Sequence, residues 1–252
     1  MNAPVKTALV TGARRGIGRA TAASLARRGM TVAVTTRGPV ASLEETVSEI
    51  ERAGGKALPF SLDLSVRSSI DTLVEGVRAA TGAVAVLVNN ALCDQPGSQA
   101  PIDTMDFAAF ERMMIGEVVN TSYLARRVLD LADPGGLTVV NVGSGAAGHV
   151  PRRPVGQGGW AFSYSATKAA LHRLAPFLQL EWGGRGVRAF TVDPGFTRTE
   201  ALLERLGDVP GSAPPALPAE VIAWLACDPR CDAGPGSCIS APAVAAAQGW
   251  EF

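Results

Sequence analysis

The sequence predicts an α/β fold with a doubly wound, seven-stranded parallel sheet and helices on both of its faces. Seven apolar segments of strand character alternate with helical patterns along the chain. A glycine-rich turn that begins at Gly12 follows the first of these segments. Hydrophobic residues make up 47% of the chain and charged residues 18%, so there is enough apolar surface for a large core. We therefore expect one domain over residues 1–252.

The expected strands are short apolar runs, which is the pattern of parallel strands that are buried on both faces. The first run, 6–11, ends at Gly12, and the others follow at 31–36, 56–61, 83–89, 137–142, 187–192 and 237–240. Between them the apolar residues recur at helical spacing. In chain order, the expected helices are 15–29, 40–53, 66–81, 103–132, 163–182 and 219–227.

Three segments lie outside this alternation, at 94–101, 145–162 and 196–218, and each follows an expected strand. In open parallel sheets, the loops beyond the carboxyl ends of the strands form the ligand crevice. We therefore expect these segments to be substrate loops. The alternative is that they are solvated connections.

The charge balance excludes several classes of partner. Lys and Arg total 23, and Asp and Glu also total 23, so no general attraction to nucleic acid or to an anionic membrane is expected.

No apolar run reaches the length of a membrane span, and the first residues lack a secretory signal, which favours a cytoplasmic location. Cys227, Cys231 and Cys238 lack the spacing and histidine partners of a zinc site, so no metal is expected.

The glycine-rich turn joins the first expected strand to the first expected helix and reads Thr11-Gly12-x-x-x-Gly16-Ile17-Gly18. Glycine permits a tight turn and lets a pyrophosphate approach the positive end of the helix. In this position the turn predicts a dinucleotide site. The alternative is a tight turn without a ligand.

The end of the second strand indicates which dinucleotide is bound. A carboxylate there is typical of NAD sites, whereas an arginine suits the 2′-phosphate of NADP. This chain has Arg37 and no carboxylate, and Arg15 can reach the same phosphate, so NADP(H) is favoured. Ordinary surface charge is the alternative for each arginine. Asp63 is a candidate to accept a hydrogen bond from adenine or to cap the next helix, and Asn90 lies where its amide can fix groups in the crevice.

Tyr164 and Lys168 are four residues apart at the start of an expected helix, so they share one face. An ammonium close to a phenol favours the phenolate and suits the phenol to general acid/base work near neutral pH. Ser144 follows the fifth strand and can donate its hydroxyl to a carbonyl oxygen held by Tyr164. A surface tyrosine beside a lysine is the alternative.

These residues occur in a recognisable order and spacing over residues 5–240. The motifs are Thr11-Gly12-x-x-x-Gly16-Ile17-Gly18, Asp63-Leu64, Asn89-Asn90-Ala91, Ser144, Tyr164-x-x-x-Lys168 and Asp193-Pro194-Gly195-x-x-x-Thr199. The chain resembles the short-chain dehydrogenase/reductase family, and most of all its ketoacyl-reductase-like branch.

The resemblance implies a Rossmann-type sheet of order 3-2-1-4-5-6-7, hydride transfer from a nicotinamide, and a homotetramer or homodimer. It implies that Tyr164 is the general acid/base, that Lys168 binds the nicotinamide ribose and that Ser144 positions the substrate. The residues expected to bind the cofactor are Gly12, Arg14, Arg15, Gly16, Ile17, Gly18, Arg37, Asp63, Leu64, Asn90, Ala91, Tyr164, Lys168, Pro194, Gly195, Thr197 and Thr199.

The chain departs from the family pattern at two positions near the expected site. Leu92 stands where the family usually has glycine, which we interpret as a reshaped pocket wall. Glu117 stands where the family usually has an asparagine that holds a water for proton relay, and we place it among the catalytic residues. Glu117 organises a water, or it pairs with Lys168, or the register is shifted and Asn120 takes this role.

The segment between Ser144 and Tyr164 is longer than is usual in the family, and we place the added residues in 149–162. Candidate substrate contacts are Leu92, Arg152, Arg153, Trp160 and Phe196. In this segment an aromatic ring can stack on Trp160 and an anion can pair with an arginine. A solvated excursion is the alternative.

Together these features predict an NADP(H)-dependent ketoreductase acting on a small to medium, apolar or aromatic carbonyl compound, or on the corresponding alcohol. An imine or enone reductase on the same fold is one alternative. A cofactor-binding scaffold or regulatory protein with little turnover is another, but the retention of Ser144, Tyr164 and Lys168 argues against it.

Overall fold

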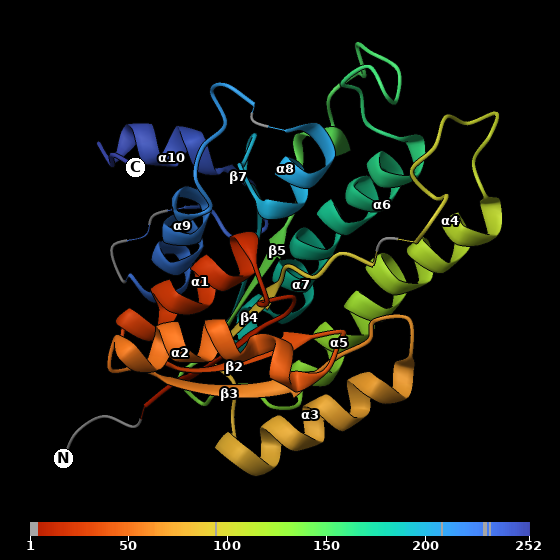
Figure 1. The fold of residues 1–252 in the computed structure, drawn as a ribbon. Coiled ribbons are helices and arrows are strands. Elements are labelled where there is room, and N and C mark those ends of the chain that lie inside the picture. Colours follow the sequence, from red (N-terminus) through yellow and green to blue (C-terminus); the bar gives the residue numbers. More distant parts are fainter. Residues whose placement is uncertain (1–4, 94, 208, 229–230, 232) are drawn as a thin grey trace.

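A seven-stranded parallel sheet forms the centre of the protein, with the strand order β3-β2-β1-β4-β5-β6-β7 (Figure 1). The computed structural model describes residues 5–93, 95–207, 209–228, 231 and 233–252. The strands are β1 Thr7–Val10, β2 Thr31–Thr36, β3 Lys56–Ser61, β4 Val86–Asn89, β5 Leu137–Val142, β6 Val187–Asp193 and β7 Cys238–Ser240. Every neighbouring pair is parallel. The predicted fold class and strand order are confirmed.

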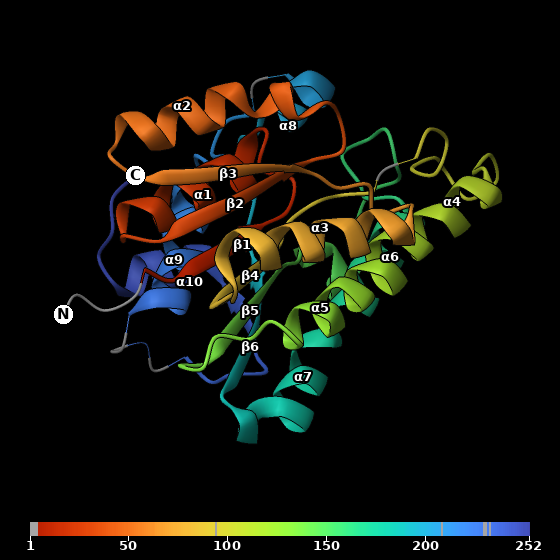
Figure 2. The same ribbon diagram turned by 90° about the horizontal axis from the view of Figure 1, so that it is seen from below.

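Helices cover both faces of the sheet (Figure 2). One face carries α1 Gly16–Arg27, α2 Glu44–Arg52 and α9 Ala216–Cys227, and the other carries α3 Arg67–Thr81, α5 Thr121–Leu129 and α7 Leu174–Trp182. The remaining α-helices of the described residues are α4 Phe107–Met114, α6 Phe162–His172, α8 Glu200–Leu206 and α10 Ala241–Ala247.

The apolar runs form central strands because their side chains alternate between two cores. In β1, Ala8 and Val10 enter the core beneath α1 and α9, whereas Leu9 enters the core beneath α3 and α5. All three side chains are fully buried. A strand with one solvated face would instead carry polar residues at every second position.

Two expected helices are interrupted in the structure. The expected helix over 103–132 begins only at Phe107, where the Asp106 side chain accepts the Ala109 N–H, and a π-helical turn, η2 Ile115–Asn120, separates α4 from α5. The expected helix over 163–182 breaks between His172 and Leu174. Pro176 has no N–H to donate to the carbonyl of the residue four positions earlier, which explains the break.

One segment that was predicted as a loop contains a helix, and a further helix lies after β7. The loop 196–218 includes α8, whose first turn is capped by Thr199 through the Leu202 N–H at 3.2 Å. The alanine-rich tail forms α10, which is capped by Ser240. The segment 145–162 contains a short 3₁₀ turn, η3 Gly145–Ala147. Residues 94 and 208 of the predicted loops lie outside the described residues.

The strand order reverses between β1 and β4, which are adjacent in the sheet but distant in sequence. At such a switch point, the connections after the two strands leave in opposite directions and open a crevice. The glycine-rich turn after β1 and the Asn90 segment after β4 therefore meet at the carboxyl edge of the sheet.

Candidate active site

The glycine-rich turn is held in place from β4. Thr11 Oγ1 accepts the backbone N–H groups of Asn90 (2.9 Å) and Ala91 (3.0 Å), and it donates to the Val88 carbonyl. The Asn90 side-chain amide donates to the carbonyls of Thr11 (2.9 Å) and Gly12 (3.1 Å). Asn90 therefore fixes the backbone of the turn, one of the roles that the sequence left open for its amide.

Glycine is required in this turn for two different reasons. Gly12 has φ +66°, and a Cβ there would lie 2.9 Å from the Ala91 Cα. Gly18 packs against the backbone of the turn itself, because a Cβ at Gly18 would lie 2.3 Å from the Gly12 carbonyl oxygen. No side chain caps the start of α1, and its first turn holds no acidic residue. Its first N–H groups therefore remain available to an anion.

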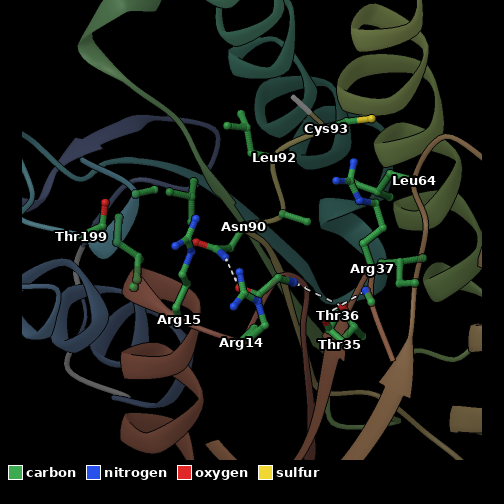
Figure 3. Close-up of a pocket in the computed structure, with 18 of the residues that line it drawn as sticks. Arg14, Arg15, Thr35, Thr36, Arg37, Leu64, Asn90, Leu92, Cys93 and Thr199 are labelled. Carbon is green, nitrogen blue, oxygen red and sulfur yellow. Dashed lines mark hydrogen bonds between the residues drawn. The ribbon is translucent and has the colours of Figure 1, made fainter. Parts of the chain in front are cut away.

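A cleft of about 740 Å³ runs along this edge of the sheet. Figure 3 shows Arg15 on the Thr199 side of the cleft and Arg37 on the Leu64 side, with Arg14 between them. Arg15 is paired with Glu204 of α8 at 2.5 Å. The three guanidinium groups make one end of the cleft cationic.

Most of the residues predicted to bind the cofactor line this cleft: Gly12, Arg14, Arg15, Gly16, Ile17, Arg37, Asp63, Leu64, Asn90, Ala91, Tyr164, Lys168, Pro194 and Thr199. Gly18, Gly195 and Thr197 do not line it, and Thr197 is buried with its hydroxyl donating to the Pro194 carbonyl. Sequence reasoning missed Thr35, Thr36, Gly38, Pro39, Ser42, Leu62, Cys93, Val142, Gly143 and Ala201. Burial raises the pKa of the Cys93 thiol, so this cleft residue stays protonated near neutral pH.

Tyr164 and Lys168 both line the cleft from α6. The Lys168 ammonium lies 5.8 Å from the centre of the Tyr164 ring and donates to the Val142 carbonyl at 3.3 Å. The shared helical face and the bond to β5 bring the ammonium beside the phenol, as the four-residue spacing predicted.

Glu117 reaches Lys168 from the π-helical turn. Its Oε2 atom lies 3.7 Å from Lys168 Nζ, and both side chains are almost fully buried. Asn120 faces elsewhere, because its amide donates to the Leu64 carbonyl at 2.6 Å and its oxygen accepts from Arg67. Of the alternatives left open by the sequence, pairing with Lys168 is the one that the structure contains.

Ser144 lies directly after β5, at the carboxyl edge of the sheet. Its hydroxyl oxygen accepts the Ala146 N–H at 3.2 Å. The hydroxyl proton is therefore left to donate to another group. Ser163, which is nearer to Tyr164 in sequence, donates to the Ser98 carbonyl at 2.6 Å and is buried.

His172 is a residue near this site that sequence reasoning missed. Its Nε2 atom accepts the backbone N–H of Ser144 at 3.2 Å. Burial lowers the pKa of His172 below its ordinary value, and the Lys168 charge lowers it further, whereas Asp193 opposes the shift. Its position four residues after Lys168 was the available signal.

The candidate substrate residues differ in location. Leu92 lines the cleft and is 45% exposed. Trp160 and Phe196 are also roughly half exposed, and neither lines the cleft. Arg152 and Arg153 are exposed in the segment before α6. The structure therefore joins Leu92 to the cleft and leaves the other four outside it.

The described residues contain no cluster of three or more His, Cys, Asp or Glu side chains that could hold a metal ion. Within the same residues, no helix has the length and hydropathy needed to span a membrane.

Comparison with known proteins supports the family resemblance. The family model described as short chain dehydrogenase matches residues 6–207. Cis-4-hydroxycyclohexanecarboxylate dehydrogenase from Sinomonas cyclohexanicum is 32% identical over 237 residues, covering 88% of this chain and 90% of that protein. The solved structure of the angucycline C-6 ketoreductase LanV with bound NADP superposes with a TM-score of 0.80 at 30% identity, covering 94% of this chain and 93% of that one. A 3-oxoacyl-[acyl-carrier protein] reductase from Brucella melitensis superposes with a TM-score of 0.79 at 25% identity over 95% and 96% of the two chains. The chain belongs to the short-chain dehydrogenase family and is an oxidoreductase that acts on a carbonyl or alcohol group.

Proposed function

We propose that this protein is an NADP(H)-dependent ketoreductase that interconverts a small to medium, apolar or aromatic ketone and its alcohol. One observation carries the proposal: Tyr164 and Lys168 line the same cleft as Arg15 and Arg37. A proton-transfer pair and a phosphate-binding end therefore share one continuous site.

The residues of the cleft fit a phosphorylated dinucleotide. The glycine-rich turn and the uncapped start of α1 can receive the pyrophosphate. Arg15 and Arg37 suit a 2′-phosphate, and the described end of β2 offers no carboxylate to bind a free ribose hydroxyl. When bound, the nicotinamide supplies the hydride. The relative LanV was solved with NADP bound, which agrees with this preference.

The protein side chains provide the proton and the orientation of the substrate. Ser144 keeps its hydroxyl proton and uses it to donate a hydrogen bond to the carbonyl oxygen, which orients the substrate. Tyr164 gives its phenolic proton to the same oxygen during reduction and takes it back during oxidation. The Lys168 ammonium stabilises the phenolate that remains, and Glu117 holds that ammonium in place.

The substrate class is inferred from exposed apolar side chains. Leu92 presents one in the cleft wall, and Trp160 before α6 and Phe196 after β6 present exposed rings on two of the expected substrate loops, outside the cleft lining. Apolar side chains that remain open to solvent favour an apolar ligand. The names of two relatives, cis-4-hydroxycyclohexanecarboxylate dehydrogenase and the angucycline ketoreductase LanV, point to cyclic substrates.

The test is NADPH oxidation by the purified protein with a panel of cyclic and aromatic ketones, quinones, imines and enones. We expect turnover on ketones, and the same panel with NADH tests the cofactor preference. The variant Tyr164→Phe should lose turnover by about 10²-fold or more while retaining NADPH binding by fluorescence titration. Turnover that persists in Tyr164→Phe would refute the assignment, and turnover on imines or enones alone would favour the alternative reductase.

A further inference from the structure

The face of α6 that carries Tyr164 and Lys168 continues to His172. The three residues are spaced by four, so they lie along one side of the helix. Tyr164 and Lys168 line the cleft, whereas His172 lies one turn deeper, beneath the end of β5. Neither the family motif nor the proposed proton transfer uses His172.

His172 contacts the backbone of the residue that orients the substrate. Its Nε2 atom is 3.2 Å from the Ser144 nitrogen and accepts that N–H. An accepting Nε2 requires the neutral tautomer with its proton on Nδ1. Ser144 is thus held at three atoms: its nitrogen by His172, its hydroxyl oxygen by the Ala146 N–H and its carbonyl oxygen by the Ala147 N–H.

Gly143, the residue before Ser144, leaves space for the His172 imidazole. A Cβ on Gly143 would lie 2.2 Å from His172 Nε2, so any larger residue at this position would displace the ring. The missing side chain at Gly143 therefore creates the space through which the imidazole reaches the Ser144 N–H.

We propose that His172 is a positioning residue for Ser144: its neutral imidazole fixes the Ser144 backbone, and its protonation releases Ser144 and slows carbonyl reduction. Both ring nitrogens of an imidazolium are donors, so a protonated Nε2 would face the Ser144 N–H with no acceptor between them. The inference rests on the proposed function, because it takes Ser144 as the group that orients the carbonyl.

The charges around His172 favour the neutral form near pH 7. Lys168 on the same helix opposes protonation, as does burial of the ring, whereas Asp193 at the end of β6 favours it. Further titratable groups on the neighbouring elements are Tyr164 on the same helix, Glu117 of η2, which pairs with Lys168, His149, which like Asp193 lies close to Gly145, and Cys238 of β7, which pairs with β6. The pKa of His172 is lowered from the ordinary value of 6.5, so the neutral form is lost only at pH values below 6.5.

The kinetic test uses two replacements of the same residue. His172→Gln places an amide where Nε2 lies and cannot titrate in this range, so it should keep kcat near the wild-type value and abolish the acid limb of the kcat/KM profile. His172→Leu removes the acceptor and should lower kcat by about threefold to tenfold at every pH, with little change in NADPH affinity. The matched control, His149→Gln, should retain the acid limb. Circular dichroism at each pH checks that all variants stay folded.

A second measurement needs no substrate. The chain has only two histidines, so ¹⁵N-histidine spectra of the wild type and of His149→Gln assign both rings. We expect the His172 ring to carry its proton on Nδ1 at pH 7.5. In a uniformly ¹⁵N-labelled sample, the Ser144 amide resonance should shift as His172 titrates.

The outcomes separate the two proposals. Any of three results would overturn the positioning role. They are a proton on Nε2 of His172, a Ser144 amide resonance that does not change as His172 titrates, and an acid limb that persists in His172→Gln. If no member of the panel is turned over, the ketoreductase proposal fails, and the spectra still decide whether His172 holds Ser144.

Discussion

Replacing Glu117 with Gln removes the carboxylate that lies 3.7 Å from the Lys168 ammonium. At this distance and an effective dielectric constant of about 20, two unit charges attract by roughly 4 kcal/mol. Part of this is offset, because the variant no longer buries a carboxylate. Breaking one partner of a buried pair usually costs about 3–5 kcal/mol, so we expect a loss near 3 kcal/mol. For a chain of this size, that loss lowers Tm by roughly 6–12 °C.

The assay is thermal and urea unfolding without cofactor at one fixed protein concentration. Glu111→Gln removes the same charge from an exposed position on α4 and should leave Tm within about 2 °C of the wild type. A double-mutant cycle with Lys168→Met should give a coupling energy of about 2–3 kcal/mol. A Glu117→Gln variant as stable as Glu111→Gln, or a coupling near zero, would refute the reasoning.

The remaining predictions concern the cationic end of the cleft. Arg37→Ala should raise the Kd for NADPH by about tenfold to hundredfold and leave the Kd for NADH nearly unchanged, because only NADPH has a 2′-phosphate. Fluorescence titration at constant salt measures both constants. Equal losses of affinity for the two cofactors would contradict the role of Arg37 in binding the 2′-phosphate. Glu204→Gln should tighten NADPH binding by about twofold to fivefold. In the wild type, the Glu204 carboxylate lies 2.5 Å from the Arg15 guanidinium and competes with the phosphate for it. A weaker affinity for NADPH in this variant would show instead that the ion pair organises the site.

Much of the fold could be predicted because local pattern and tertiary burial agree. The runs 31–36, 56–61 and 137–142 coincide with β2, β3 and β5. Where the prediction was wrong, the decisive interaction was a single side chain. Asp106 sets the start of α4, and Thr199 starts α8 inside a segment that its prolines marked as irregular. Capping residues such as Asp and Thr can be recognised in a sequence, but they indicate a helix start less strongly than the periodicity of apolar residues indicates a helix.

The site was predictable where a residue type is tied to its neighbours in sequence. Tyr164 and Lys168 share a helical face, and Gly12, Gly16 and Gly18 belong to one turn. Sequence spacing alone therefore places the members of each group together. The residues that were missed or left open depend on contacts between distant elements. The pairing of Glu117 with Lys168 could be seen only once η2 was placed against α6. The spacing of four residues after Lys168 places His172 on the same helical face, but His172 was missed because its partner is a backbone N–H, which the sequence does not identify.

The position of α6 determines all of these contacts together. One face of this helix carries two groups that meet two separate elements: Lys168 meets Glu117 of η2, and His172 meets the end of β5. The helix is held at its start, where Ser163 donates to the Ser98 carbonyl and Phe162 packs edge-on against Phe110 at 5.7 Å. These two anchors come from the loop after β4 and from α4, the same region as the expected substrate loop. A substrate that moves that loop would therefore move α6, and the Lys168 and His172 contacts would change with it.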